Sequence, residues 1–164
     1  MEETTGDIGI GGHGVLYFKK KQRIGSRVWY GTGSGGYRSM NWTVDADLWG
    51  TESNGMSALG GFGLGLGTQR WQDNDVGELT MSTYILKGQG SVTYRRRQQA
   101  YEIGAYAGLV LPGTVDFQPI NEDKYRIDGA SSTGFYPQVG IQATVFFGDF
   151  KPPTSGKKKG KKRR

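Results

Sequence analysis

Apolar and polar residues alternate along most of this chain. In the clearest run, 40–49, one parity carries only apolar residues: Met40, Trp42, Val44, Ala46 and Leu48. Successive side chains of a β-strand point to opposite faces of a sheet, so this alternation predicts an extended strand with one apolar face. The same period of two marks six further runs, 8–18, 23–30, 61–69, 78–87, 101–111 and 138–147. The chain is therefore predicted to be all-β.

The most regular run is rich in glycine. From Gly61 to Gly67 every odd position is glycine, and the even positions are Phe62, Leu64 and Leu66. Four glycines would each cost a helix about 1 kcal/mol relative to alanine, and the period is 2 instead of 3.6. A flexible linker, the alternative interpretation, is usually polar between its glycines. The pattern favours an ordered strand with one face of large apolar side chains and one face of bare backbone.

Two stretches leave the number of strands open. Residues 87–90 form either a turn or a bulge, and a bulge would let one strand continue from residue 78 through Tyr94. The dipeptide Pro112-Gly113 is expected to stop a strand, and a short strand is expected at 124–128 in the polar stretch that follows. Either interpretation gives about eight strands, with nine or ten as alternatives. So many hairpin-linked strands form an antiparallel sheet that must close or stack.

The positions that alternate with the apolar ones, which we call the polar parity, indicate which face of the sheet lies inside. The polar parity carries charged residues together with glycines, whereas a strand that faces water has few glycines because glycine weakens it. Inside a small closed barrel, glycine leaves room for larger neighbours. Interior charges are costly unless they pair, so opposite charges are expected to meet across neighbouring strands. The expected interior contains a charge network of Arg23, Arg27, Asp45, Asp47 and Glu102, the glycines Gly61, Gly63, Gly65 and Gly67, and Trp49.

The apolar parity is then expected to face lipid. Its representatives are Trp42, Val44, Phe62, Leu64, Leu66, Ile103, Leu109, Ile141, Val145 and Phe147. Aromatic residues gather near the ends of the runs, as in the aromatic girdles of outer-membrane barrels, with ordinary core aromatics as the alternative explanation. The predicted fold class is a closed, antiparallel, up-and-down transmembrane β-barrel of about eight strands.

Composition and charge narrow the class further. No run approaches the roughly 18 apolar residues of a membrane helix, whereas a barrel strand needs only about 9–11 alternating residues. The chain has no cysteine, which excludes disulfides and cysteine-based metal sites. Of the net charge of +6, residues 151–164 hold 8 Lys/Arg and no acid, so 1–150 is nearly neutral. The expected organisation is an N-terminal segment at 1–6, a barrel at 7–150 and a disordered basic tail at 151–164.

Two segments carry a resemblance to a known family. They are the strand at 102–109 and the closing strand at 138–147, where a polar residue and a glycine precede alternating apolar positions that end in an aromatic. Together with the strand pattern over 7–150, they make the chain similar to the small eight-stranded outer-membrane β-barrels of the OmpA-transmembrane-domain and OmpX class. In that family the last aromatic follows the glycine sooner, and the chain often stops there.

The resemblance implies a bacterial outer-membrane protein with a structural or interaction role. The acidic first residues lack the basic and apolar regions of a secretory signal, so we expect the mature form of an exported protein. Eight strands leave an interior that side chains fill, so at most a narrow, porin-like path for water is expected. The alternative is a soluble β-barrel or sandwich that binds a small apolar ligand or, through its basic tail, an anionic polymer such as nucleic acid.

Catalytic chemistry has little support in the sequence. His13 is the only histidine, which excludes a cluster of histidine ligands, and we expect it to be a structural interior residue. Asp45 and Asp47 have the chemistry of a general acid and base, but the nearby arginines favour a charge network. Residues 9–14 resemble a dinucleotide loop, but no helix follows. We expect no enzyme, no cofactor and no metal site, with an outer-membrane lipid-modifying enzyme as the less favoured alternative.

The basic tail suggests an anionic partner. Its expected anion-binding residues are Lys157, Lys158, Lys159, Lys161, Lys162, Arg163 and Arg164. Besides membrane lipid, the candidate partners are lipopolysaccharide, an acidic cell-wall polymer and another envelope protein, and salt would weaken the binding. Nucleic acid is less favoured, because the aromatic residues do not share a parity with Lys/Arg as a stacking platform requires. A solvated tail without a partner is the alternative.

Overall fold

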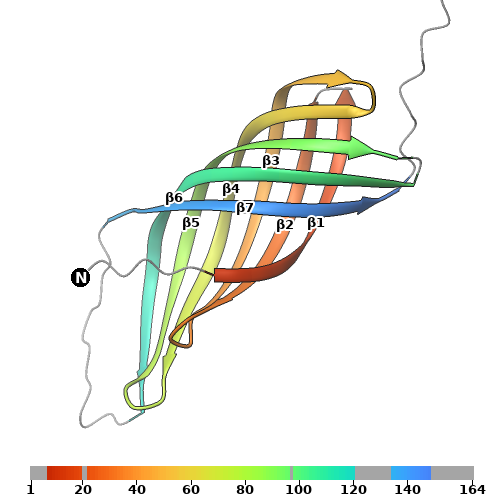
Figure 1. The fold of residues 1–164 in the computed structure, drawn as a ribbon. Coiled ribbons are helices and arrows are strands. Elements are labelled where there is room, and N and C mark those ends of the chain that lie inside the picture. The colour runs from red at the N-terminus through yellow and green to blue at the C-terminus, as the bar shows by residue number, and fades with distance from the viewer. Residues whose placement is uncertain (1–6, 20–21, 97, 121–133, 149–164) are drawn as a thin grey trace, which may run out of the picture.

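The computed structural model describes residues 7–19, 22–96, 98–120 and 134–148, and every regular element in them is a β-strand (Figure 1). The strands are β1 (Asp7–Lys19), β2 (Gln22–Gly33), β3 (Arg38–Ser53), β4 (Met56–Asp73), β5 (Gly77–Arg95), β6 (Gln99–Pro119) and β7 (Tyr136–Phe147). They form one sheet in which strands adjacent in sequence are adjacent in space. In the described residues no helix has the length and apolar character needed to cross a membrane.

All six neighbouring strand pairs are antiparallel, so the sheet is an up-and-down meander. Because the strands number seven, β1 and β7 run in the same direction. No ladder joins these two edge strands in the part of the chain that the structure describes. The predicted all-β antiparallel meander is confirmed, with seven strands in the residues that the structure describes. The strand expected at 124–128 lies outside the described residues.

β5 is one uninterrupted strand with no register shift at residues 87–90, so both the turn and the bulge considered there are wrong. Gly88 and Gly90 both lie in an unbroken ladder with β4. The glycines have the composition of a turn, but side chains of this stretch bond to β3. Lys87 donates to a hydroxyl of β3 at 3.2 Å, and Gln89 donates to a carboxylate of β3 at 2.9 Å. Tertiary bonds to β3 and ladders on both sides keep this stretch extended.

Proline does not end β6 where the sequence predicts. The strand passes through Pro112-Gly113 and ends at Pro119. Its pairing with β5 shifts register at this point, which forms a β-bulge, and a bulge tolerates the missing N–H of a proline. The N–H of Thr114 donates to the Ser82 hydroxyl of β5 at 2.8 Å, so a side chain replaces the interrupted ladder bond.

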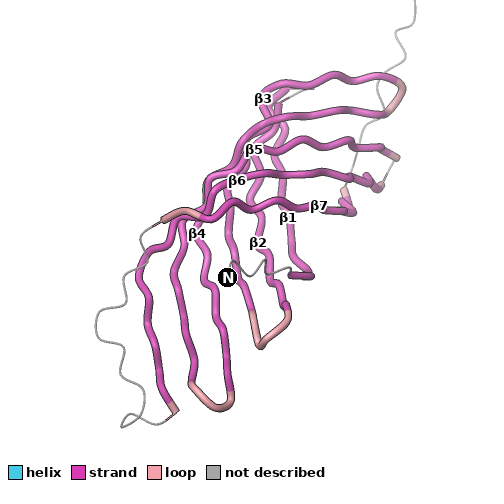
Figure 2. The backbone as a smooth tube through the Cα atoms, turned by 60° about the vertical axis from the view of Figure 1, so that its left-hand side comes forward, coloured by secondary structure: helices cyan, strands magenta, loops and turns pink. Residues whose placement is uncertain are grey.

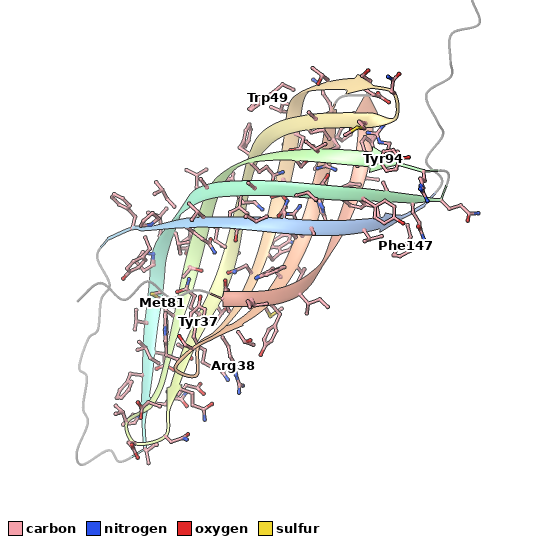
Figure 3. All side chains as sticks on the ribbon, in the orientation of Figure 1. Tyr37, Arg38, Trp49, Met81, Tyr94 and Phe147 are labelled. Atoms are coloured by element: carbon pink, nitrogen blue, oxygen red, sulfur yellow. The ribbon has the colours of Figure 1, made fainter. Side chains whose placement is uncertain are left out.

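A second register shift turns Trp49 to the outside of the sheet. It lies in β3, between Asp47 and Trp49, and one extra residue there reverses the alternation. Trp49 is 59% exposed, and its side chain points away from the ribbon (Figure 3). The expectation that Trp49 shares the inward parity of Asp47 is therefore wrong.

The hairpins differ in length between the two ends of the sheet. Two, two and three residues join β1 to β2, β3 to β4 and β5 to β6 at one end, which we call the short-turn end. Four, three and sixteen residues join the remaining pairs at the other end, the long-loop end. The β3–β4 turn is Asn54-Gly55, with φ values of 50° and 80°. Positive φ at both positions defines the type I′ hairpin that Asn-Gly favours.

The sheet is strongly curved (Figures 1 and 2). Nη1 of Arg23, on β2, lies 2.6 Å from Oε2 of Glu102, on β6. These strands are four positions apart, which would separate them by about 19 Å in a flat sheet. The sheet therefore has a concave face, onto which these side chains converge, and a convex face of the opposite parity.

The concave face is mostly polar. Among the described residues, twelve polar or charged residues are buried but only seven apolar ones. Three of the apolar ones are buried toward the short-turn end: Leu59, Ala100 and Phe146. A second apolar group, the apolar layer, lies toward the long-loop end, where β5 turns Met81 and Ile85 inward, against the outward trend of apolar residues elsewhere. Tyr37 lies at the same end (Figure 3) and packs against the Trp71 ring at 5.2 Å. Burial raises the pKa of the Tyr37 phenol above its ordinary value of 10, so the hydroxyl is neutral in the folded protein.

Candidate functional site

The candidate site is a cluster of buried charges on the concave face. On β2 and β3, alternate side chains point to this face, and the register places Arg23 directly opposite Asp47. Nε of Arg23 lies 2.5 Å from Oδ2 of Asp47, and both side chains are almost fully buried. Opposite charges therefore meet here because neighbouring strands carry them at the same level.

Glu102 of β6 joins the cluster from across the concave face. Besides its contact with Arg23, its Oε2 accepts a hydrogen bond from Oγ1 of Thr93 at 2.9 Å. Its other oxygen lies 4.0 Å from Nη2 of Arg27. One buried carboxylate thus faces two guanidinium groups of β2, and this contact holds β6 close to β2.

Arg27 connects the cluster to both edge strands. Its Nε lies 3.8 Å from Oδ2 of Asp45, and its Nη1 donates a hydrogen bond to Oε1 of Gln142 on β7. Its Nη2 lies 3.0 Å from Nδ1 of His13 on β1. The His13 ring also packs against Phe146 of β7, with ring centroids 5.3 Å apart. Side chains therefore reach across the concave face between β1 and β7, although no backbone ladder joins these strands.

Lys87 of β5 is a member of the cluster that the sequence did not indicate. Its Nζ lies 3.0 Å from Oδ1 of Asp45 and donates to Oγ1 of Thr43 at 3.2 Å. It also lies 5.6 Å from the centroid of the Tyr106 ring. The glycines after Lys87 suggested a turn, which hid its place in the strand. Lys87 also shares the apolar parity of Met81 and Ile85, so alternation alone would have placed it on the convex face.

The cluster is electrically balanced. The structure brings together all five residues expected in the charge network, and the addition of Lys87 makes three cations and three carboxylates: Arg23, Arg27, Lys87, Asp45, Asp47 and Glu102. Asp45 faces two cations, and Asp47 bonds to Arg23 and to the amide of Gln89. Buried charges of this kind are stable only while each keeps its partner, so the cluster favours one fixed arrangement of the strands.

Glycines provide the space that these long side chains occupy. The alternate glycines of β4 all face the concave side: Gly61, Gly63, Gly65 and Gly67. A Cβ at Gly63 would contact Oδ1 of Asp45 and come within 2.7 Å of Cε of Lys87. Asp45 of β3 and Lys87 of β5 meet across β4 because β4 presents only backbone there.

The ten residues expected to face lipid all lie exposed on the convex face. Their exposed fractions range from 38% at Leu109 to 82% at Ile141. The other eight are Trp42, Val44, Phe62, Leu64, Leu66, Ile103, Val145 and Phe147. The convex face is thus apolar over the strands that enclose a polar concave face.

Two hollows adjoin the charged cluster. The larger, of about 540 Å³, lies between the edge strands and is lined mainly by residues 7–13 of β1 and 141–145 of β7. The smaller, of about 50 Å³, lies beside Arg27 and Lys87. The larger hollow coincides with the place where β1 and β7 face each other without a ladder.

Other sites expected from the sequence lie partly outside the residues that the structure describes. Within the residues that the structure describes, no group of three or more His, Asp and Glu side chains is placed to hold a metal ion. The N-terminal segment 1–6 and the tail, with its candidate anion-binding lysines and arginines, lie outside the described residues.

Comparison of the chain with protein-family models, with curated proteins and with solved structures gives no significant match. The fold and the charged cluster therefore define a class: an all-β protein built on one curved, seven-stranded antiparallel meander. A narrower assignment has to come from the chemistry of the two faces of the sheet.

Proposed function

We propose that this chain is a membrane-spanning β-barrel of a bacterial outer membrane, with a structural or interaction role. The observation that supports this most is the distribution of side chains between the two faces of the sheet. Charged side chains are buried on the concave face, and large apolar side chains are exposed on the convex face. A membrane barrel has this arrangement, because hydrocarbon surrounds it and its interior is polar. In water, the same convex face would be an apolar patch large enough to cause association.

Closure of the sheet into a barrel is part of the proposal. In hydrocarbon, every backbone N–H and C=O must find a partner within the protein, which only helices and closed barrels achieve. Strands β2 to β6 have ladder partners on both sides, and only the edges of β1 and β7 lack one in the described residues. The contacts of β7 with Arg27 and His13 keep the edges of β1 and β7 next to each other across the concave face.

The charged cluster argues against a substantial pore. Six charged side chains from four strands meet on the concave face, and about eight strands enclose just enough space for side chains. We propose that the protein acts through its loops and tail, whose partners would be lipopolysaccharide, a cell-wall polymer or another envelope protein, and that it needs no cofactor.

A soluble protein that binds a small apolar ligand is the alternative. Such a ligand would need an apolar hollow of its own size, but the smaller hollow measures only about 50 Å³ and combines Trp29 and Ile85 with the charged Arg27 and Lys87. The apolar layer near Met81 and Ile85 is already buried by its own side chains. The charge distribution therefore favours the membrane function.

Refolding tests the membrane function directly. We expect the protein to fold only when it is diluted from urea into detergent micelles, and to migrate differently in electrophoresis with and without boiling. A monodisperse, fully folded protein in detergent-free buffer would refute the proposal.

A matched pair of variants at Leu64 sharpens the test. Leu64→Arg should lower the free energy of unfolding in bilayers by about 2–4 kcal/mol, because it places a charge on the lipid-facing side, whereas Leu64→Ile should be nearly neutral. Equal stability of the two variants in lipid vesicles would contradict a lipid-facing Leu64.

A further inference from the structure

The edge strands β1 and β7 face each other across a seam, which we define as the hollow lined by residues 7–13 and 141–145. Seven consecutive residues of β1 line one wall, a length of about 20 Å. Both walls are strand edges without a ladder partner in the described residues. The seam is therefore long and narrow and is bordered by backbone hydrogen-bonding groups.

Three isoleucines beside the seam are more exposed than the apolar side chains of the inner strands, whereas Val145 is 49% exposed. Ile8, Ile10 and Ile141 are 86%, 78% and 82% exposed, whereas Val44 and Leu64 on inner strands are 43% and 59% exposed. A neighbouring strand covers part of each convex side chain on the inner strands. The difference is what one missing neighbour on each edge would produce.

We propose that the seam receives one extended strand from a partner polypeptide, antiparallel to both β1 and β7. The inference rests on the proposed membrane function, because hydrocarbon leaves unpaired strand edges without any hydrogen-bonding partner. Since β1 and β7 run in the same direction, a single strand running the opposite way forms antiparallel ladders with both. The completed barrel would have an even number of antiparallel strands, as single-chain bacterial barrels do.

The surroundings of the seam define the chemistry of the added strand. On the concave side, His13 and Phe146 are in ring contact and Arg27 is bonded to Gln142, so inward side chains of the added strand must be small. On the convex side, exposed isoleucines border the seam, so outward side chains should be apolar. The partner strand therefore alternates small and large apolar residues over at least seven positions, and pairs by β-augmentation.

Other occupants fit the seam less well. A lipid acyl chain would cover the isoleucines but would leave the N–H and C=O groups of both edges unbonded. A second copy of the chain would bring a whole sheet to each edge, and the seam would have to open widely. The pairs of Arg23 and Arg27 with Glu102 hold β2 and β6 together and oppose that opening.

A peptide in trans tests the proposal. The probe has the sequence of residues 60–69, in which 61–67 alternate glycine with large apolar residues, with lysines added at both ends for solubility. We expect it to bind the protein in micelles at one peptide per chain and to shift the urea unfolding midpoint upward. A peptide of the same composition in an order without alternation is the control and should cause no shift.

The same strand fused ahead of Met1 through an Asn-Gly turn removes the dependence on peptide affinity, because the fusion raises its effective concentration. The fused protein should unfold at higher urea than one that carries the control sequence. If neither the peptide nor the fusion shifts the midpoint beyond its control, the proposal is overturned.

Paired cysteines measure the width of the seam, since the chain has no cysteine of its own. The pair Ile10→Cys/Ala143→Cys should resist disulfide formation in the protein alone. The negative control is Ile10→Cys/Met40→Cys, whose residues are two strands apart and should also resist it. Ile10→Cys/Tyr30→Cys joins paired neighbours and should oxidise readily. Ready oxidation of the Ile10/Ala143 pair in micelles would show direct β1–β7 closure and would refute only the added strand, whereas folding in plain buffer would refute the membrane function.

Discussion

Two regions of the concave face are buried in different ways. Toward the middle, six charged side chains are held by pairing across β2, β3, β5 and β6. Toward the long-loop end, Tyr37, Met81, Ile85 and Val110 are buried as an apolar layer. In the charged cluster each side chain depends on particular partners, and in the apolar layer each depends mainly on filled volume. Substitutions should therefore have different consequences in the two regions.

The largest effect is expected at the carboxylate that joins opposite sides of the charged cluster. Glu102→Gln should lower the free energy of unfolding in micelles by about 3–5 kcal/mol, because Arg23 and Arg27 stay buried without their shared partner. Glu52→Gln is the matched control, since Glu52 pairs with Arg95 at 3.4 Å in a less buried position and should cost at most about 1 kcal/mol. If urea titrations gave similar losses of unfolding free energy for both variants, the buried cluster would contribute no more to stability than the less buried pair.

A volume change in the apolar layer should have the next largest effect. Ile85→Ala should cost about 2–4 kcal/mol in the same titration, because it leaves a cavity at a buried position. The neighbouring Leu86→Ala, on the exposed convex face, leaves no cavity and should cost clearly less. The reverse order would mean that the two faces of β5 are assigned wrongly.

Adding volume between members of the charged cluster should cost about 1–3 kcal/mol. Gly63→Leu would press on Asp45 and Lys87, so overpacking should lower the unfolding midpoint and refolding yield. Gly88→Leu is the control, since a Cβ there meets no atom closer than 3.9 Å. If Gly63→Leu refolds as well as Gly88→Leu, the glycines of β4 do not serve as space for the cluster.

The smallest effect is a dependence on pH at the apolar end. Burial raises the pKa of Tyr37, so the folded state favours the protonated phenol. This contribution is complete below the ordinary pKa of about 10 and is lost as the pH rises through the higher value in the folded protein. The wild type should therefore lose stability relative to Tyr37→Phe as the pH rises above about 10. A constant difference across that range would exclude a role for this titration.

Alternation was enough to predict most strands and the parity of most side chains. It placed Arg23 and Arg27 on the same side as Asp45 and Asp47, because hairpin neighbours share a sheet face when the register is regular. It failed at Trp49, where a single bulge reverses the parity. It also failed at Pro112 and at Lys87, because Pro and Gly signal a break only where no neighbouring strand holds the backbone extended.

The relation between the two edges could not be predicted from local sequence. Strand patterns fix the partners of hairpin neighbours, but the approach of β1 to β7 depends on the curvature of the whole sheet. That curvature is set by contacts such as the one between Arg23 and Glu102, which are separated by most of the sheet. Counting the alternating runs therefore predicts the fold class, but it does not predict how β1 and β7 lie relative to each other.

The odd number of strands in the described residues places the two ends of the sheet on opposite sides. Asp7 begins β1 at the long-loop end, and Phe147 completes β7 at the short-turn end. In outer-membrane barrels short turns face the periplasm and long loops face the exterior. In the proposed membrane, Phe147 would thus lie on the periplasmic side and Asp7 on the side of the cell surface. Protease or antibody added to intact cells would then reach a tag placed ahead of Asp7 but not one placed after Phe147.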